Sequence, residues 1–431
     1  MKAYSYVLVL TVVLMVAGCS SKKNQFESRE GSPNQIFTQS AEEIQKSDDD
    51  SKEKAERFAL LGQTALESPK ASHLAIQAFE EALKLDGYNA RANFYSALLL
   101  PVLSLKGLPM MMSEILTPKY TQEIIDSTLK GIRDESIRLV VSDLMKDGKA
   151  GAVFKTPSEF QQFITAQFLP TLEESQRRLE VVSKSADFKV TFDFGHWGRR
   201  RSLKTTVTLD HVEANSAKTA MKGVSVWAKI ISAYNFDDAL SLRDKYMAKD
   251  RESRRQMTFK DVVDDIKQYP RLLAINSNGA DLLRSARESI SDTSEGIKIV
   301  ANMLGTNRAE REGKLIPAFD EYEQYFGCRA GSCMVNDILS GPFAAPFGKK
   351  KRQERTVLLD GTVVFYRPIA DLKALLPTEF DASGKLAKTF PDVHFGGIVP
   401  NGDLLSTYCS MSKETKNVDL PVVCPEEKKT N

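Results

Sequence analysis

The chain of 431 residues is long enough for two or three ordinary domains or for one long helical array. Its 59 lysine and arginine residues almost balance its 57 aspartate and glutamate residues, so the formal net charge is only +2. A balanced charge provides no general attraction to nucleic acid, and we expect no nucleic-acid partner.

Residues 1–18 have the pattern of a signal peptide. Lys2 provides the positive start, an apolar run interrupted only by Thr11 extends from Val7 to Ala17, and small residues precede the expected cleavage point. The run is much shorter than the roughly 20 residues that a membrane-spanning helix needs. We therefore expect another group to hold the mature protein on a membrane.

The segment Val16-Ala17-Gly18-Cys19 resembles the lipobox of bacterial lipoproteins, in which the cysteine thiol is acylated and the chain is cut just before it. The resemblance implies palmitate-type lipid on Cys19 and no other cofactor. Each buried methylene contributes about 0.8 kcal/mol, so several acyl chains would provide a durable anchor. Ser20 implies the outer membrane, with the protein facing the periplasm. The alternative is an ordinary secretory leader followed by an incidental cysteine.

Residues 19–51 are polar and end in Ser47-Asp48-Asp49-Asp50-Ser51. Their few apolar residues follow no regular period, which predicts a flexible tether between the lipid and the folded body.

Two helical runs follow the tether, separated by Ser68-Pro69. Their small and aromatic residues are spaced as in a tetratricopeptide repeat, which they resemble. The residues that carry this resemblance are Gly62, Ala65, Ala75, Phe79 and Ala82, then the turn from Leu85 to Ala90, then Ala92, Phe94 and Ala97. The resemblance fades after Leu100. It implies a mainly α fold, a repeat-like array of helical hairpins over residues 52–326, in which later helices continue the stack in degenerate form.

Capping patterns predict further helix starts in this body. They are Thr117-Pro118, Thr156-Pro157-Ser158-Glu159, Asp210 with Glu213, and Thr258 with Asp261. A long apolar face between Asp210 and Tyr234 predicts a central helix; it includes Val212, Met221, Val224, Trp227, Ala228 and Ile231.

Alternating apolar residues predict two β-hairpins. The first covers about residues 187–209 and carries a basic loop. The second covers residues 356–365, with Asp360-Gly361 as its turn. It lies in a region rich in cysteine, glycine and proline, residues 327–431, which we expect to form an irregular α+β cap on the helical body.

Four cysteines lie in the expected cap: Cys328, Cys333, Cys409 and Cys424. Beyond the inner membrane the compartment is oxidising, which favours two disulfides over a four-thiolate zinc site. Four cysteines allow three connectivities; we prefer Cys328–Cys333 with Cys409–Cys424, because these neighbouring pairs close the shortest loops.

The sequence contains no G-x-S-x-G elbow, H-E-x-x-H helix, phosphate-binding loop or dinucleotide fingerprint. The four histidines lie outside helical reach of one another, so we expect no metal site. Because no catalytic motif occurs, we also expect no catalytic residues. A pair of carboxylates for glycoside hydrolysis stays open, because only geometry distinguishes such a pair.

Two segments are candidates for a partner or ligand surface. One is Met110-Met111-Met112, whose ordinary interpretation is core or an interhelical turn. The other is the hairpin loop with His196-Trp197 and the cations Arg199, Arg200 and Arg201, whose ordinary interpretation is a solvated loop.

The anchor and the repeat resemblance together predict a membrane-anchored protein that binds or scaffolds a protein partner in the cell envelope and is not an enzyme. The alternative is a carrier that holds a lipid or another small apolar ligand in a helical pocket near Leu98 to Met112.

Overall fold

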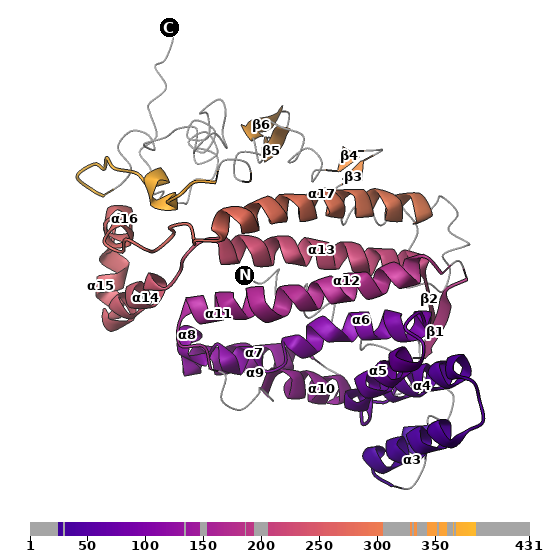
Figure 1. The fold of residues 1–431 in the computed structure, drawn as a ribbon. Coiled ribbons are helices and arrows are strands. Elements are labelled where there is room, and N and C mark those ends of the chain that lie inside the picture. Colours follow the sequence, from indigo (N-terminus) through magenta and orange to yellow (C-terminus); the bar gives the residue numbers. More distant parts are fainter. Residues whose placement is uncertain are drawn as a thin grey trace. The chain divides into compact units, whose positions relative to one another are not determined.

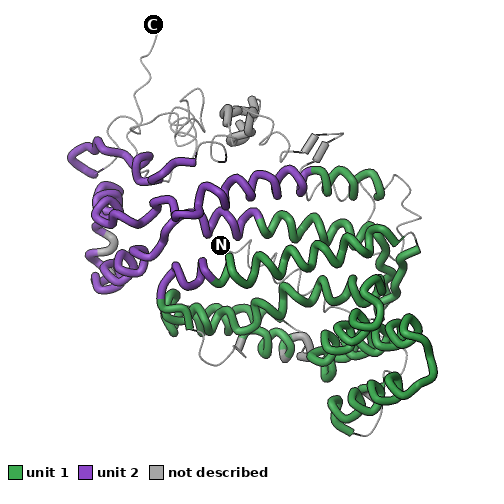
Figure 2. Tube along the Cα trace, in the orientation of Figure 1, with its two compact units in different colours: residues 1–155, 163–225, 295–326 green, residues 156–162, 226–294, 327–431 purple. Residues whose placement is uncertain are grey.

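The computed structural model describes residues 25–28, 31–132, 135–146, 153–185, 187–193, 206–304, 328–329, 332–333, 343–350, 353–359, 365 and 368–384. The fold is mainly helical with small two-stranded antiparallel sheets (Figure 1). The chain forms two compact units (Figure 2). Unit 1 contains residues 1–155, 163–225 and 295–326; unit 2 contains residues 156–162, 226–294 and 327–431. The units exchange segments along the chain, so the expected boundary at residue 326 marks only the last of these exchanges.

Unit 1 begins with a series of helices, three of which have side-chain caps. The series is α2 (Gln25–Ser28), α3 (Pro33–Lys46), α4 (Ser51–Leu66), η1 (Ser72–Leu74), α5 (Ala75–Leu85) and α6 (Ala90–Ser104). Ser32 and Gln35 form a capping box at the start of α3, while Asp50 and Asn89 cap α4 and α6. Each cap satisfies backbone N–H groups that the first helical turn leaves without partners.

Helix α3 corrects the expected tether over residues 19–51. The segment 33–46 is helical, and its side chains Ile36, Phe37 and Ile44 are buried. These apolar residues recur at helical spacing, which a composition dominated by polar residues conceals. The prediction of a flexible tether is therefore wrong for this segment.

Helices α4 and α5 pack closely, as the spacing of their small residues predicts. Gly62 on α4 leaves room for the Phe79 ring on α5, and Phe58, Phe79 and Phe94 are almost completely buried. The Phe79 ring also stacks on Tyr95 of α6, with ring centroids 5.5 Å apart. These aromatic contacts join three consecutive helices into one core.

The first predicted β-hairpin is confirmed. Strand β1 (Lys189–Asp193) pairs antiparallel with β2 (Thr206–Asp210). The hairpin packs on the first helices of unit 1, because Phe188 contacts Phe94 at 5.1 Å and Phe192 contacts Tyr95 at 5.9 Å between ring centroids.

The rest of unit 1 continues with helices of uneven length. They are α7 (Leu108–Met111), α8 (Ser113–Leu116), α9 (Pro118–Gly131), α10 (Glu135–Lys146), the C-terminal end of α11 (Pro157–Phe163), the π-helix η2 (Ile164–Phe168) and α12 (Leu169–Ser183). Helix α12 packs against α6 (Figure 1). The predicted start at Thr117 is confirmed, because its side chain accepts the Tyr120 N–H.

An ion-pair cluster joins α12 to α5. The buried Arg178 guanidinium donates to Glu80 at 2.8 Å and to Glu174 at 2.7 Å, and Arg177 also donates to Glu174. Hydrogen bonds from Arg177 and then Arg178 lower the pKa of Glu174 from 4.5 to about 2, against the opposing effect of its partial burial. Glu174 is thus held in its charged form.

This lowered pKa predicts a loss of stability in acid. A depressed folded-state pKa stabilises the fold above the unfolded pKa, and that contribution disappears as the pH falls from about 4.5 towards about 2. We expect Glu174→Gln to lower the free energy of unfolding at about pH 6 and to have much less effect at about pH 3. Urea unfolding of both proteins, with Glu173→Gln as a control, measures this. Equal effects at the two pH values would contradict it.

The long helix predicted between residues 210 and 234 is α13 (His211–Ala233). Its residues contact residues of α17 (Gly279–Leu304) within each unit. In unit 1, Gly296 lies against Thr219; in unit 2, the Lys229 ammonium donates to Ser289 at 2.8 Å. Trp227 and Ile231, expected on the buried face, are instead 54% and 42% exposed. The regular spacing therefore predicted the helix but not which of its residues are covered.

Unit 2 also contains the shorter helices α14 (Asp238–Ala248), α15 (Arg251–Gln256) and α16 (Phe259–Lys267). The capping box predicted at Thr258 and Asp261 is confirmed. A C-terminal segment, residues 368–384 with the short helix η4 (Leu372–Leu375), packs on this unit: Phe380 contacts Phe259, and Gly384 accepts the Lys260 N–H.

Lys373 fastens this C-terminal segment. Its ammonium is almost completely buried and donates to the backbone carbonyls of Pro270, at 2.8 Å, and Leu272. We expect Lys373→Met to lower the stability of unit 2 by about 1–3 kcal/mol, because two backbone carbonyls, one of them in the buried Leu272, lose a charged donor. Thermal unfolding would be compared with Lys260→Met, which removes only an exposed ion pair. Equal effects would show that Lys373 contributes no more than a surface cation.

The remaining strands are β3 (Cys328–Arg329), β4 (Ser332–Cys333), β5 (Phe343–Lys350) and β6 (Gln353–Leu359). Cys328 lies opposite Cys333 in the β3–β4 pair, but no disulfide is present among the described residues. Cys409 and Cys424 lie outside those residues. Strand β6 contains the first half of the expected 356–365 hairpin and pairs with the preceding β5; the Asp360-Gly361 turn also lies outside the described part.

Candidate functional site

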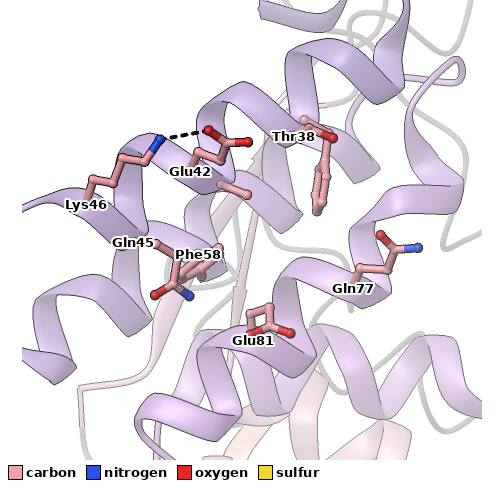
Figure 3. Close-up of a pocket in the computed structure, with 9 residues that line it drawn as sticks. Thr38, Glu42, Gln45, Lys46, Phe58, Gln77 and Glu81 are labelled. Carbon is pink, nitrogen blue, oxygen red and sulfur yellow. Dashed lines mark hydrogen bonds and ion pairs between the residues drawn. The ribbon is translucent and has the colours of Figure 1, made fainter.

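Helices α3, α4 and α5 form an open groove with a volume of about 350 Å³ (Figure 3). Most of its exposed lining is apolar, and polar side chains border it. The lining residues are Phe37, Thr38, Ala41, Glu42, Gln45 and Lys46 from α3, Phe58 from α4, and Gln77 and Glu81 from α5. We call this feature the α3–α5 groove.

The groove follows from the two faces of α3. Ile36, Ser40 and Ile44 are spaced four residues apart and are buried. The adjacent face carries Thr38, Ala41 and Gln45 towards the groove, where the small side chain of Ala41 takes up little of the space. On the opposite side, Gln77 and Glu81 lie one helical turn apart on α5 (Figure 3). The groove is therefore built by regular helices rather than by loops.

The charged groups at the border are paired only within their own helices. Lys46 donates to Glu42 at 2.9 Å, and Lys84 donates to Glu81 at 2.6 Å. All four side chains are at least 40% exposed, so each pair contributes little to stability. An incoming charge can replace either intrahelical partner at small cost.

The other side of α4 and α6 is covered by the β1–β2 hairpin. Gln63 donates its side-chain N–H to the Thr191 carbonyl at 2.7 Å. Arg91 of α6 donates to both Gln63 and Glu56 of α4, so a polar network continues from the hairpin along the two helices. The hairpin therefore makes this face of α4 and α6 inaccessible to a partner protein, whereas the α3–α5 groove is open to solvent.

Tyr95 lies at the centre of the covered face. Its ring is 2% exposed, and its hydroxyl has no hydrogen-bond partner in the described structure. Burial, together with nearby Glu67, raises the pKa of Tyr95, while Arg91 lowers it. The hydroxyl is thus held in its neutral form, and three neighbouring aromatic rings pack against the Tyr95 ring, which indicates a part in core packing.

Of the residues predicted from the sequence to form a surface, the three methionines of residues 110–112 do not line the groove. Met110 is 41% exposed on α7, and the Met111 carbonyl accepts the Phe154 N–H at 2.8 Å. His196, Trp197, Arg199, Arg200 and Arg201 lie outside the described residues, as does Cys19. Sequence reasoning missed the groove because it treated residues 33–46 as tether; the Ser32–Gln35 capping pattern and the spacing of Ile36, Phe37 and Ile44 were the available signals.

No family model, curated protein or solved structure matches the chain. The geometry of the chain's own residues therefore has to support any functional assignment.

Two properties of the described residues bear on alternative kinds of site. These residues contain no group of three or more histidine, cysteine, aspartate or glutamate side chains able to hold a metal ion. One segment, Ala90–Met111, is long and apolar enough by length and composition to cross a membrane. Its Asn93 and Ser96 are buried and bonded to backbone carbonyls, and α6 packs against α5 and α12. These are features of a core helix in the first half of the segment, whereas most residues from 98 to 111 are only partly buried.

Proposed function

We propose that this chain is a lipid-anchored protein of the bacterial envelope, facing the periplasm from the outer membrane, which binds a segment of a partner protein in the α3–α5 groove without catalysis. The observation that carries the proposal is the groove itself: an apolar floor with a polar border, built on ordered helices. This composition is typical of surfaces that receive a helix or an extended peptide.

The size of the groove favours a protein segment over a lipid. Small-molecule sites commonly enclose about 300–1,000 Å³ and bury most of their ligand. The α3–α5 groove has about 350 Å³ and is open to solvent, so it can receive a few side chains but cannot enclose acyl chains. The tight α4–α5 pair and the packing of α6 on α12 also support a tetratricopeptide-like arrangement, in which stacked hairpins present binding surfaces.

A carrier for a small apolar ligand is the second candidate. It is favoured by the partly exposed apolar stretch from Leu98 to Met112, in which Met110 is 41% exposed. Methionine side chains adapt well to apolar ligands. This candidate predicts a bound small molecule that depends on Met110 and not on the α3–α5 groove.

Native mass spectrometry of the protein extracted from its own membranes separates these functions. We expect a partner subunit with the wild-type chain, loss of that subunit in Ala41→Trp, which fills the groove, and retention in Gln39→Trp, which places the same side chain on an exposed position of α3 outside the groove. A small-molecule adduct lost in Met110→Gln would favour the carrier. A subunit that Ala41→Trp retains would contradict groove binding.

A further inference from the structure

We infer that the segment bound in the α3–α5 groove is a basic amphipathic helix of a membrane-embedded protein, held next to the bilayer that carries the lipid anchor. The inference rests on the proposed function and adds the chemistry and the location of the partner. Three features of the chain support it: the length of the connection to Cys19, the charge of the first helices, and the residues that line the groove.

The connection between the anchor and the folded body is short. Only five residues separate Cys19 from Gln25, where α2 begins, and an extended chain covers at most about 3.5 Å per residue. The start of α2 is therefore within about 20 Å of the lipidated cysteine. Phe26 is 3% exposed, and α2 packs against α3 and α4, so this helix belongs to the body that forms the groove. The groove is consequently close to the membrane surface.

The first helices are acidic although the whole chain is nearly neutral. Residues 31–90 contain eleven acidic and six basic residues, a formal charge of −5, against +2 for the full chain. A negatively charged surface is repelled by anionic lipid headgroups and attracts cationic segments. This charge disfavours a lipid headgroup as the occupant and favours a lysine- or arginine-rich segment.

The lining of the groove fits a few side chains of an amphipathic helix. Ala41 and the exposed edge of Phe37 offer a small apolar surface above the buried Phe58 ring, and Glu42 and Glu81 border that surface from opposite helices. Their present partners, Lys46 and Lys84, are exposed and come from the same helices. Cations on either side of the apolar face of an incoming helix can pair with both carboxylates. These pairs would fix the position of the helix and would make the groove prefer a basic segment.

Selection from a random peptide library tests the chemistry of the occupant. The full lipidated chain in detergent would be the target, with counter-selection on Ala41→Trp to remove peptides that bind elsewhere. We expect enrichment of positively charged sequences with apolar residues at helical spacing. Groove-dependent peptides that are neutral or acidic would overturn this inference while leaving the proposed function intact; failure to enrich any groove-dependent peptide would overturn both.

Charge variants provide a second readout on the selected peptides. Glu42→Gln with Glu81→Gln is expected to weaken binding by about 3- to 10-fold, because each exposed pair contributes up to about 1 kcal/mol. The matched control, Glu43→Gln with Asp48→Asn, removes the same charge from residues that do not line the groove. Equal weakening by both pairs would show that the carboxylates at the border do not select the partner.

Linker insertion tests the location of the occupant. About twenty glycine and serine residues inserted between Lys23 and Asn24 would add about 25 Å of average reach and lower the local concentration of groove and partner. We expect the partner subunit seen by native mass spectrometry to fall at least about 3-fold relative to the wild type. An unchanged yield would overturn the assignment to a segment beside the bilayer.

Discussion

Replacing Gly62 with leucine is expected to lower the free energy of unfolding of unit 1 by about 3 kcal/mol. A Cβ atom at this position would lie 2.6 Å from Cε1 of Phe79, closer than two carbon atoms can approach. The Phe79 ring has no room to move away, because it is completely buried and stacks on Tyr95. Urea unfolding measures the loss.

Two further variants show whether this packing is the cause. Gly131→Leu is the control, since a Cβ there meets no atom within 4 Å. The double variant Gly62→Leu with Phe79→Ala should lose much less free energy of unfolding than the two single variants lose together. The reason is that the leucine side chain occupies the space that the Phe79 ring vacates. Helix propensity alone favours leucine over glycine by up to about 1 kcal/mol, so a neutral or stabilised Gly62→Leu would refute the close approach of α4 and α5.

Loss of the Cys19 thiol is expected to release the protein from the membrane. The variant would combine Cys19→Ser with a leader that ordinary signal peptidase cleaves, so that no uncleaved apolar run remains. Without acyl chains the body would lose the proposed anchor, and its acidic first helices would be repelled by anionic lipid. Membrane fractionation and labelling with palmitate measure this.

We expect the wild-type chain to be labelled and to sediment with membranes, and the variant to be unlabelled and soluble. The same leader exchange with Cys19 retained controls for the effect of the leader. A variant that still sediments with membranes would contradict anchoring by lipid alone and would direct attention to the apolar segment Ala90–Met111.

The local parts of the fold could be predicted from the sequence. The α4–α5 pair follows from the spacing of Gly62, Ala65 and Phe79, and the first hairpin follows from the alternating apolar residues between about 187 and 209. These signals are strong because each depends on residues near one another in the chain. Helix starts at Thr117 and Thr258 were equally local, because a cap acts on the next three residues.

Features that depend on distant residues could not be predicted in the same way. The exposure of Trp227 depends on what packs against α13, which periodicity does not specify. Strand β5 contains Pro346, a residue that argues against an interior strand, yet it pairs with β6. The groove combines residues 37–46 with residues 58–81, and its recognition required α3 to be seen as a helix with two different faces.

Site-specific photo-crosslinking in intact cells tests the central claim most directly. A benzophenone amino acid would replace Thr38, which lines the α3–α5 groove, or its exposed neighbour Gln39, which does not. We predict that the Thr38 position yields one dominant adduct, that mass spectrometry maps it to a basic segment of a membrane protein, and that Ala41→Trp abolishes it. The same adducts from both positions, or a Thr38 adduct that persists in Ala41→Trp, would contradict the groove as the binding site.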